Sequence, residues 1–140
     1  MRPPAYVLWA VLACISYSLV APLVRVATAQ VPSNVAAFLS NGVLLVVIIG
    51  VVAVSSESIG PYVMTRGAGF LYLAGLFLGI GILAYYRALE LGPVSIVVPI
   101  FAMFIVGGSV IGFALLDETI TIRRVGGILL AILAVYLIST

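Results

Sequence analysis

The chain has 140 residues, of which 65% are hydrophobic and only 7% are charged, and its formal net charge is +2. Soluble domains carry about 25% charged residues, so this much apolar surface requires lipid as its solvent. The small net charge and the lack of a basic run exclude a nucleic-acid-binding role. A single cysteine and no histidine exclude an intrachain disulfide and a His/Cys metal site, and we expect no cofactor.

Five apolar segments predict a single transmembrane domain over residues 1–140. About 20 helical residues, at 1.5 Å each, cross a hydrocarbon layer of about 30 Å. The first four segments reach that length and the fifth is slightly short. The alternation typical of a membrane β-barrel is absent, so the predicted fold class is an all-α polytopic membrane protein with five transmembrane helices. The segments cover residues 5–26, 33–54, 67–89, 93–116 and 123–138.

The connections between these segments are short and contain the residues that end helices. Residues 30–34 contain a proline, followed by Ser33 as the expected N-cap of the second helix. Residues 117–124 contain charges of both signs, and Glu118 is expected to pair with Arg123 or Arg124. No connection is long enough for a soluble domain.

The first segment has an alternative interpretation as a secretory signal peptide. An apolar run follows Arg2 and leads to Ala27-Thr28-Ala29, which imitates a cleavage site. The run is longer than the ~7–15 residues of a signal-peptide core, and Pro22 and Arg25 interrupt the approach to the site. We therefore favour a retained first helix.

Arginine placement predicts the orientation in a cell (inner) membrane. Five crossings put the two termini on opposite faces, and the face richer in arginine is the cytoplasmic one. We expect the N-terminus in the cytoplasm and the C-terminus outside. The N-terminal face has four arginines and the other face has two: Arg2, Arg66, Arg123 and Arg124 against Arg25 and Arg87.

Aromatic residues near the segment ends are expected to anchor the helices at the lipid–water interface. They fall into one group on the N-terminal face and one on the opposite face: Tyr6, Trp9, Tyr62 and Tyr72, and then Tyr85 and Tyr86.

The stretch AYYRALELGPVSIVVPI, residues 84–100, joins the third segment to the fourth. Gly92 is suited to the left-handed conformation that ends a helix, and Pro93 has the fixed φ of a first helical turn. We therefore expect a tight hairpin here. Arg87 and Glu90 are three residues apart on one helix face and are expected to pair.

Two runs, YLAGLFLGIGILAYYRALELGPVSIVVPI and LLDETITIRRVGGILLAILAVYLIS, resemble the EamA-type domain of the drug/metabolite transporter superfamily. That family ends its third helix in an aromatic-Arg-Ala-Leu stretch followed by Gly-Pro-x-Ser. It also has an early proline in the fourth helix, matched by Pro99, an acidic residue before the fifth, matched by Glu118, and a glycine early in the fifth, matched by Gly126. Half-size members with about five spans fit best.

The resemblance implies a carrier of small molecules that needs a second domain. Full-length relatives contain two such domains, inverted relative to one another, with the substrate at the midplane between them. A homodimer, parallel or antiparallel, or a heterodimer with a related small membrane protein would supply the second half. Small multidrug pumps of the same superfamily have a glutamate within the first helix; here that helix contains none, which argues against their proton-coupling mechanism.

Small residues recur four positions apart in the last three segments, a spacing that lets helices approach closely in lipid. Packing within one bundle and a dimer interface both remain open. The pairs are Gly75 and Gly79, Gly108 and Gly112, and Gly127 and Ala131.

A few polar or helix-breaking positions are candidates for the wall of a substrate cavity. Pro99 removes the amide bond to the Ser95 carbonyl and should kink its helix. Asn41, close to a midplane, needs a partner from a neighbouring helix or a substrate. The substrate-binding candidates are Tyr17, Asn41, Tyr86, Arg87, Glu90, Pro99 and Ser109.

Two functions fit these observations, and catalysis is not one of them. The chain has no histidine, no paired deep carboxylates and no base to activate a nucleophile. The first hypothesis is a transporter that works by alternating access as a dimer; the uncharged interior favours a small neutral, apolar or lipid-linked substrate. The alternative is a non-transporting membrane subunit, or a subunit of a lipid-linked-sugar flippase, that acts with a partner protein.

Overall fold

The computed structural model describes residues 5–115, 119 and 121–139, and these residues form α-helices joined by short turns. They fall into two compact units, Met1–Leu91 and Gly92–Thr140. Each helix boundary lies within two residues of a predicted segment boundary, apart from a break inside the fourth segment. This agreement confirms the all-α polytopic class.

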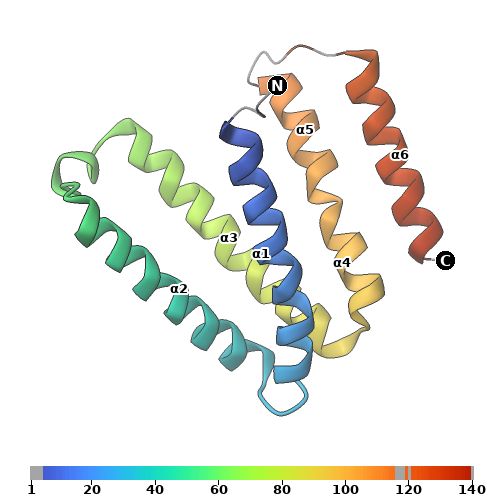
Figure 1. Cartoon of the computed structure of the whole chain (residues 1–140), viewed down its shortest axis with the longest axis horizontal. Coiled ribbons are helices and arrows are strands. Elements are labelled where there is room, and N and C mark those ends of the chain that lie inside the picture. The colour runs from blue at the N-terminus through green and yellow to red at the C-terminus, as the bar shows by residue number, and fades with distance from the viewer. Residues whose placement is uncertain (1–4, 116–118, 120, 140) are drawn as a thin grey trace. The chain divides into compact units, whose positions relative to one another are not determined.

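The first unit consists of three long helices (Figure 1): α1 (Ala5–Ala27), α2 (Ser33–Ser55) and α3 (Arg66–Leu91), with a short 3-10 turn, η1 (Gly60–Tyr62), between the last two. Helix α3 packs against both α1 and α2. The C-terminal ends of α1 and α3 meet the N-terminal end of α2 (Figure 1).

The second unit contains α4 (Val94–Ala102), α5 (Phe104–Leu115) and α6 (Ile122–Ser139). Helix α6 packs along both α4 and α5. Helices α4 and α5 form the predicted fourth segment, which is interrupted at Met103, where the Met103 amide donates to the Ile100 carbonyl at 3.1 Å. The helix continues through Pro99, and the interruption follows it by about one turn.

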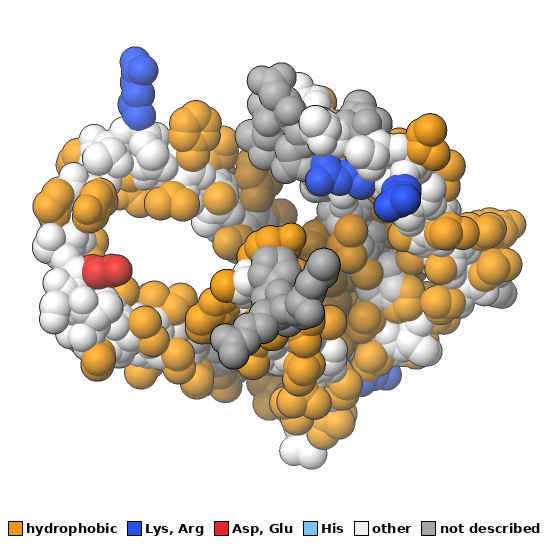
Figure 2. All heavy atoms as spheres, turned by 45° about the horizontal axis from the view of Figure 1, so that its top comes forward, with side chains coloured by type: hydrophobic (Ala, Val, Ile, Leu, Met, Phe, Trp, Pro, Cys, Tyr) orange, Lys and Arg blue, Asp and Glu red, His pale blue; other side chains and the backbone are white. Residues whose placement is uncertain are grey.

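Among the described residues, four helical segments are long and apolar enough to cross a membrane, namely α1, α2, α3 and residues 94–114. Only 11% of the apolar window in α1 and in α2 is buried within the protein, and 6% in α3. Figure 2 shows hydrophobic side chains over most of the visible face. Lipid tails cover such surfaces in a bilayer, where each helix satisfies its own backbone hydrogen bonds. Helix α6 has 18 residues, about 27 Å, and its crossing remains a prediction.

The core of the first unit is concentrated at the end where its three helices meet. Leu89 is completely buried, and small side chains of α1 and α2 surround this region and allow close approach. The buried residues of this end are Ala21, Val24, Thr28, Ser33, Ala36, Ala37, Tyr86 and Leu89.

Three local expectations about helix ends are wrong. Ser33 is the first residue of α2, Pro32 occupies the N-cap position, and no side chain caps the helix end. Gly92 does not adopt a left-handed conformation, since the only positive φ among the described residues belongs to Ser56, after α2. Pro93 precedes α4 with extended backbone, φ −70° and ψ 142°. Proline disfavours helical geometry in the residue before it, and this alone suffices to end α3 before Gly92.

Two other expectations concern side chains near the helix ends and between helices. Tyr86 is 3% exposed and is therefore a core residue, not an interfacial anchor. A Cβ atom added to Gly75 or Gly79 would meet no atom within 4 Å, so neither glycine mediates close packing within its own unit. The expected pairing of Glu118 lies outside the described residues, as does Arg2.

Candidate functional site

Six polar side chains gather where the three helices of the first unit meet. We call this group the polar junction. It consists of Arg25 from α1, Ser33 and Ser40 from α2, and Tyr86, Arg87 and Glu90 from α3.

Arg25 joins α1 to the C-terminal end of α3. Its Nη1 atom donates to the backbone carbonyls of Leu89 and Glu90, both at 2.7 Å. The last carbonyls of a helix have no partner within the helix and carry the negative end of its dipole, so a guanidinium stabilises them by hydrogen bonding and by charge. Arg25 therefore caps α3 from a neighbouring helix.

Glu90 joins the same end of α3 to the start of α2. Its Oε2 atom accepts a hydrogen bond from Arg87 Nη1 at 2.6 Å, which confirms the predicted pair. The Ser33 hydroxyl and backbone amide also lie within hydrogen-bonding reach of the Glu90 carboxylate. The first amides of a helix lack partners and attract negative charge. Glu90 thus places a negative charge close to the N-terminus of α2.

Tyr86 forms a third link, between α3 and α2. Its hydroxyl and the Ser40 hydroxyl are 2.7 Å apart. Ser40 Oγ also donates to the Ala37 carbonyl at 3.2 Å. Since Ser40 has one hydroxyl proton and a carbonyl can only accept, both contacts are satisfied when Tyr86 donates to Ser40. The Tyr86 ring packs edge-on to Tyr85, with centroids 6.4 Å apart.

The chemistry of the polar junction is that of binding and positioning. Two guanidiniums and one carboxylate meet here, and no buried side-chain nitrogen or oxygen of the described residues lacks a hydrogen-bond partner. Within the same described residues, no three His, Cys, Asp or Glu side chains form a possible metal site. The arrangement fixes three helix ends relative to one another.

The structure brings Tyr86, Arg87 and Glu90 together, but it places Tyr17 and Asn41 outside the polar junction. Tyr17 is 72% exposed on α1. Asn41 is half-buried, and its side-chain amide donates to the Ala37 carbonyl of its own helix at 2.8 Å, where we expected a neighbouring helix or a substrate as partner. A substrate role for any of these residues stays a prediction.

The two remaining candidates, Pro99 and Ser109, belong to the second unit. Ser109 lines a groove of about 320 Å³ between α5 and α6, together with Phe113, Arg124 and Gly127. Its hydroxyl donates to the Ile105 carbonyl one turn earlier, at 2.8 Å. Pro99 is half-buried within α4. Both remain candidates on sequence grounds.

Sequence reasoning missed the roles of Arg25, Ser33 and Ser40. From the sequence, Arg25 counted only toward the arginine bias and against a signal peptide, and Ser33 was expected to cap its own helix. A signal existed for Arg25, because a cation near a segment end suits a helix C-terminus. The sequence did not indicate which helix would receive it.

Comparison with known proteins agrees with this structure. Residues 4–140 match the model of the EamA-like transporter family. A protein of Sinorhizobium sp, described as "Uncharacterized transporter in cobO 3'region", is 33% identical over 117 residues, which cover 83% of this chain and 83% of that protein. No solved structure gives a significant match. The chain therefore belongs to the EamA-like transporter family and is a multi-pass membrane transporter of the drug/metabolite type.

Proposed function

We propose that this transporter moves its substrate by alternating access as a dimer, in which each chain supplies one half of the transport unit. The observation that carries the proposal is that one EamA-like domain fills residues 4–140. Transporters of the inverted-repeat type place the substrate at the interface of two repeats. A second copy of this domain would complete that interface, and an antiparallel copy would reproduce the inverted arrangement.

The polar junction supports this proposal because it makes one end of α1, α2 and α3 a connected body. Arg25 fixes α1 to α3, and Tyr86 and Glu90 fix α3 to α2. Alternating access is largely the rocking of one repeat against the other. Helices that rock together need contacts that hold through the movement, and hydrogen bonds to helix-end carbonyls and amides provide them.

The exposed apolar faces of the first unit also support an assembly of two chains. The helices leave most of their apolar windows uncovered by the protein itself. Gly75 and Gly79 lie on α3 with space around them in their own unit. Helix association in lipid depends on close packing of small residues. These faces are available to lipid or to a second copy.

Reconstitution tests the proposal. The purified chain is placed in phosphatidylcholine vesicles, and uptake of radiolabelled neutral amino acids, nucleosides and benzyltrimethylammonium is compared with that of empty vesicles. Saturable uptake by vesicles that contain only this chain is the expected result. Inertness toward the whole panel, together with co-purification of one particular membrane protein, would instead identify a non-transporting or flippase subunit.

A further inference from the structure

A second feature of the first unit lies away from the polar junction, at the loop between α2 and α3. A pocket of about 520 Å³ opens here, between the end of α2, the η1 turn and the start of α3. Its apolar lining includes Val52, Ile59, Ala68 and Leu71. Pockets of roughly 300–1,000 Å³ suit small organic ligands.

The pocket contains an acidic side chain without an ion-pair partner among the described residues. Glu57 lines it, and no described side chain forms an ion pair with the Glu57 carboxylate. Arg66, the nearest cation in the sequence, is not among the lining residues. The other acidic residue of the described chain, Glu90, is paired with Arg87. Glu57 is thus the one described carboxylate whose charge the protein does not neutralise.

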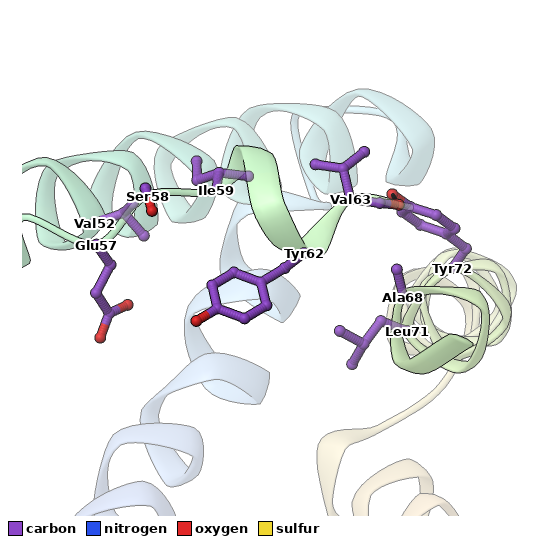
Figure 3. A pocket seen from close by; sticks show the side chains of 9 residues that line it. All are labelled: Val52, Glu57, Ser58, Ile59, Tyr62, Val63, Ala68, Leu71 and Tyr72. Carbon is purple, nitrogen blue, oxygen red and sulfur yellow. Dashed lines mark hydrogen bonds between the residues drawn. The ribbon is translucent and has the colours of Figure 1, made fainter. Parts of the chain in front are cut away.

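An aromatic ring lines the same pocket as this carboxylate. Figure 3 shows the Tyr62 ring and the Glu57 carboxylate directed to the same side of the loop, with Leu71 facing the ring from α3. Tyr72 donates its hydroxyl to the Val63 carbonyl at 2.8 Å, and this bond holds the loop against α3. A carboxylate, a tyrosine ring and apolar side chains that line one pocket are the kinds of group that recognise an organic cation.

We propose that this pocket binds an organic monocation with an apolar body, such as an aryl ammonium compound. The Glu57 carboxylate pairs with the cationic head, the Tyr62 ring contributes cation–π attraction, and the apolar side chains receive the body. The interpretation of this pocket as an entry site for substrate rests on the proposed transport function. Its interpretation as a binding site does not. The uncharged helix interior favoured a neutral substrate, and the Glu57 carboxylate at the loop extends the expected ligands to an organic cation.

Equilibrium binding of radiolabelled benzyltrimethylammonium tests the proposal. The full chain is held in phosphatidylcholine nanodiscs, and empty nanodiscs correct for partition into lipid. Glu57→Gln removes the charge and keeps the shape, and should weaken binding about 5-fold, since an exposed ion pair is worth up to about 1 kcal/mol. Tyr62→Leu should weaken it about 2- to 5-fold, the value of an exposed cation–π contact.

Matched control variants distinguish the loss of a contact with the cation from a general disturbance of the protein. Tyr62→Phe keeps the ring, so the affinity of this variant should stay within about 2-fold of the wild type. That change is smaller than the one expected when the cation–π contact is lost. Tyr6→Leu removes an equally exposed tyrosine on α1, 74% against 68% exposed, and should leave binding unchanged. The wild type alone provides a further test, because raising the salt concentration to 1 M should weaken a charge-dependent complex.

The outcomes distinguish the site from the transport proposal. Binding that Glu57→Gln leaves unchanged, or that is no greater than in empty nanodiscs, overturns the site. Saturable binding without any uptake in vesicles supports the site and contradicts transport of this cation. Uptake of other solutes that does not depend on Glu57, together with absent binding, overturns the site and leaves the transport proposal standing.

Discussion

The Tyr86–Ser40 hydrogen bond predicts an asymmetry between two small substitutions. Tyr86 is 3% exposed and its hydroxyl lies 2.7 Å from Ser40 Oγ, whereas Ser40 also has the Ala37 carbonyl of its own helix within reach. Tyr86→Phe removes the phenol oxygen and leaves Ser40 bonded to its own helix. Ser40→Ala leaves a buried phenol hydroxyl without a partner.

The expected magnitudes follow from this difference. An interhelical hydrogen bond in a membrane protein contributes about 0.6 kcal/mol on average, so Tyr86→Phe should lower the free energy of unfolding by about 0.5–1 kcal/mol. Leaving a buried donor unsatisfied costs about 1–3 kcal/mol, so Ser40→Ala should lower it by about 1–2 kcal/mol. In the double variant no hydroxyl is left unsatisfied, and its cost should fall back to about that of Tyr86→Phe.

The assay is equilibrium unfolding in mixed micelles as the fraction of denaturing detergent is raised, followed by circular dichroism. The two single variants and the double variant form a double-mutant cycle, which isolates the pairwise interaction. The distinctive result is that adding Tyr86→Phe to Ser40→Ala restores stability. A double variant no more stable than Ser40→Ala would refute the hydrogen-bond assignment.

Three further predictions concern the same end of the first unit. Arg25→Gln removes the charge from two 2.7 Å bonds and should lower the free energy of unfolding by about 1–2 kcal/mol, a value reduced by solvent exposure; an unchanged detergent midpoint would show that α3 needs no such cap. Leu89→Ala, at a completely buried position, should cost about 2–4 kcal/mol, whereas Leu91→Ala, at a position 70% exposed, should cost less than about 0.5 kcal/mol; equal costs would place the core elsewhere. Glu90→Gln should lower the melting temperature more than Arg87→Gln, because Glu90 also contacts the start of α2; the reverse order, measured by thermal unfolding, would contradict the role of Glu90 at that helix end.

The sequence predicted the helices well because their signal is local. Uninterrupted apolar runs and the prolines between them fix where a helix crosses lipid and where it must end. The Arg87–Glu90 pair was predictable for the same reason, since both residues belong to one helix. Because these rules involve only residues close together in the chain, the predicted helix boundaries lie within two residues of the observed ones.

The polar junction depends on which helices meet, and that information is not local. Serine is a residue type that favours the N-cap position, but in the structure Ser33 is the first residue of α2, and it interacts with a glutamate from α3. Tyr86 stands in a segment-end position typical of interfacial aromatics, but small residues of α2 let α3 approach and bury it. Gly92 was expected to end α3 in a left-handed conformation, but it does not have a positive φ. The following proline already disfavours helical geometry at position 92.

The proposed mechanism requires two copies of the domain in one transport unit. The direct measurement is single-molecule photobleaching of the chain, labelled with one fluorophore at its C-terminus and diluted in phosphatidylcholine vesicles. Two-step bleaching that persists as the protein-to-lipid ratio falls is the predicted result. Single-step bleaching at every ratio, in vesicles that still show saturable uptake, would mean that one domain transports alone and would contradict the central claim.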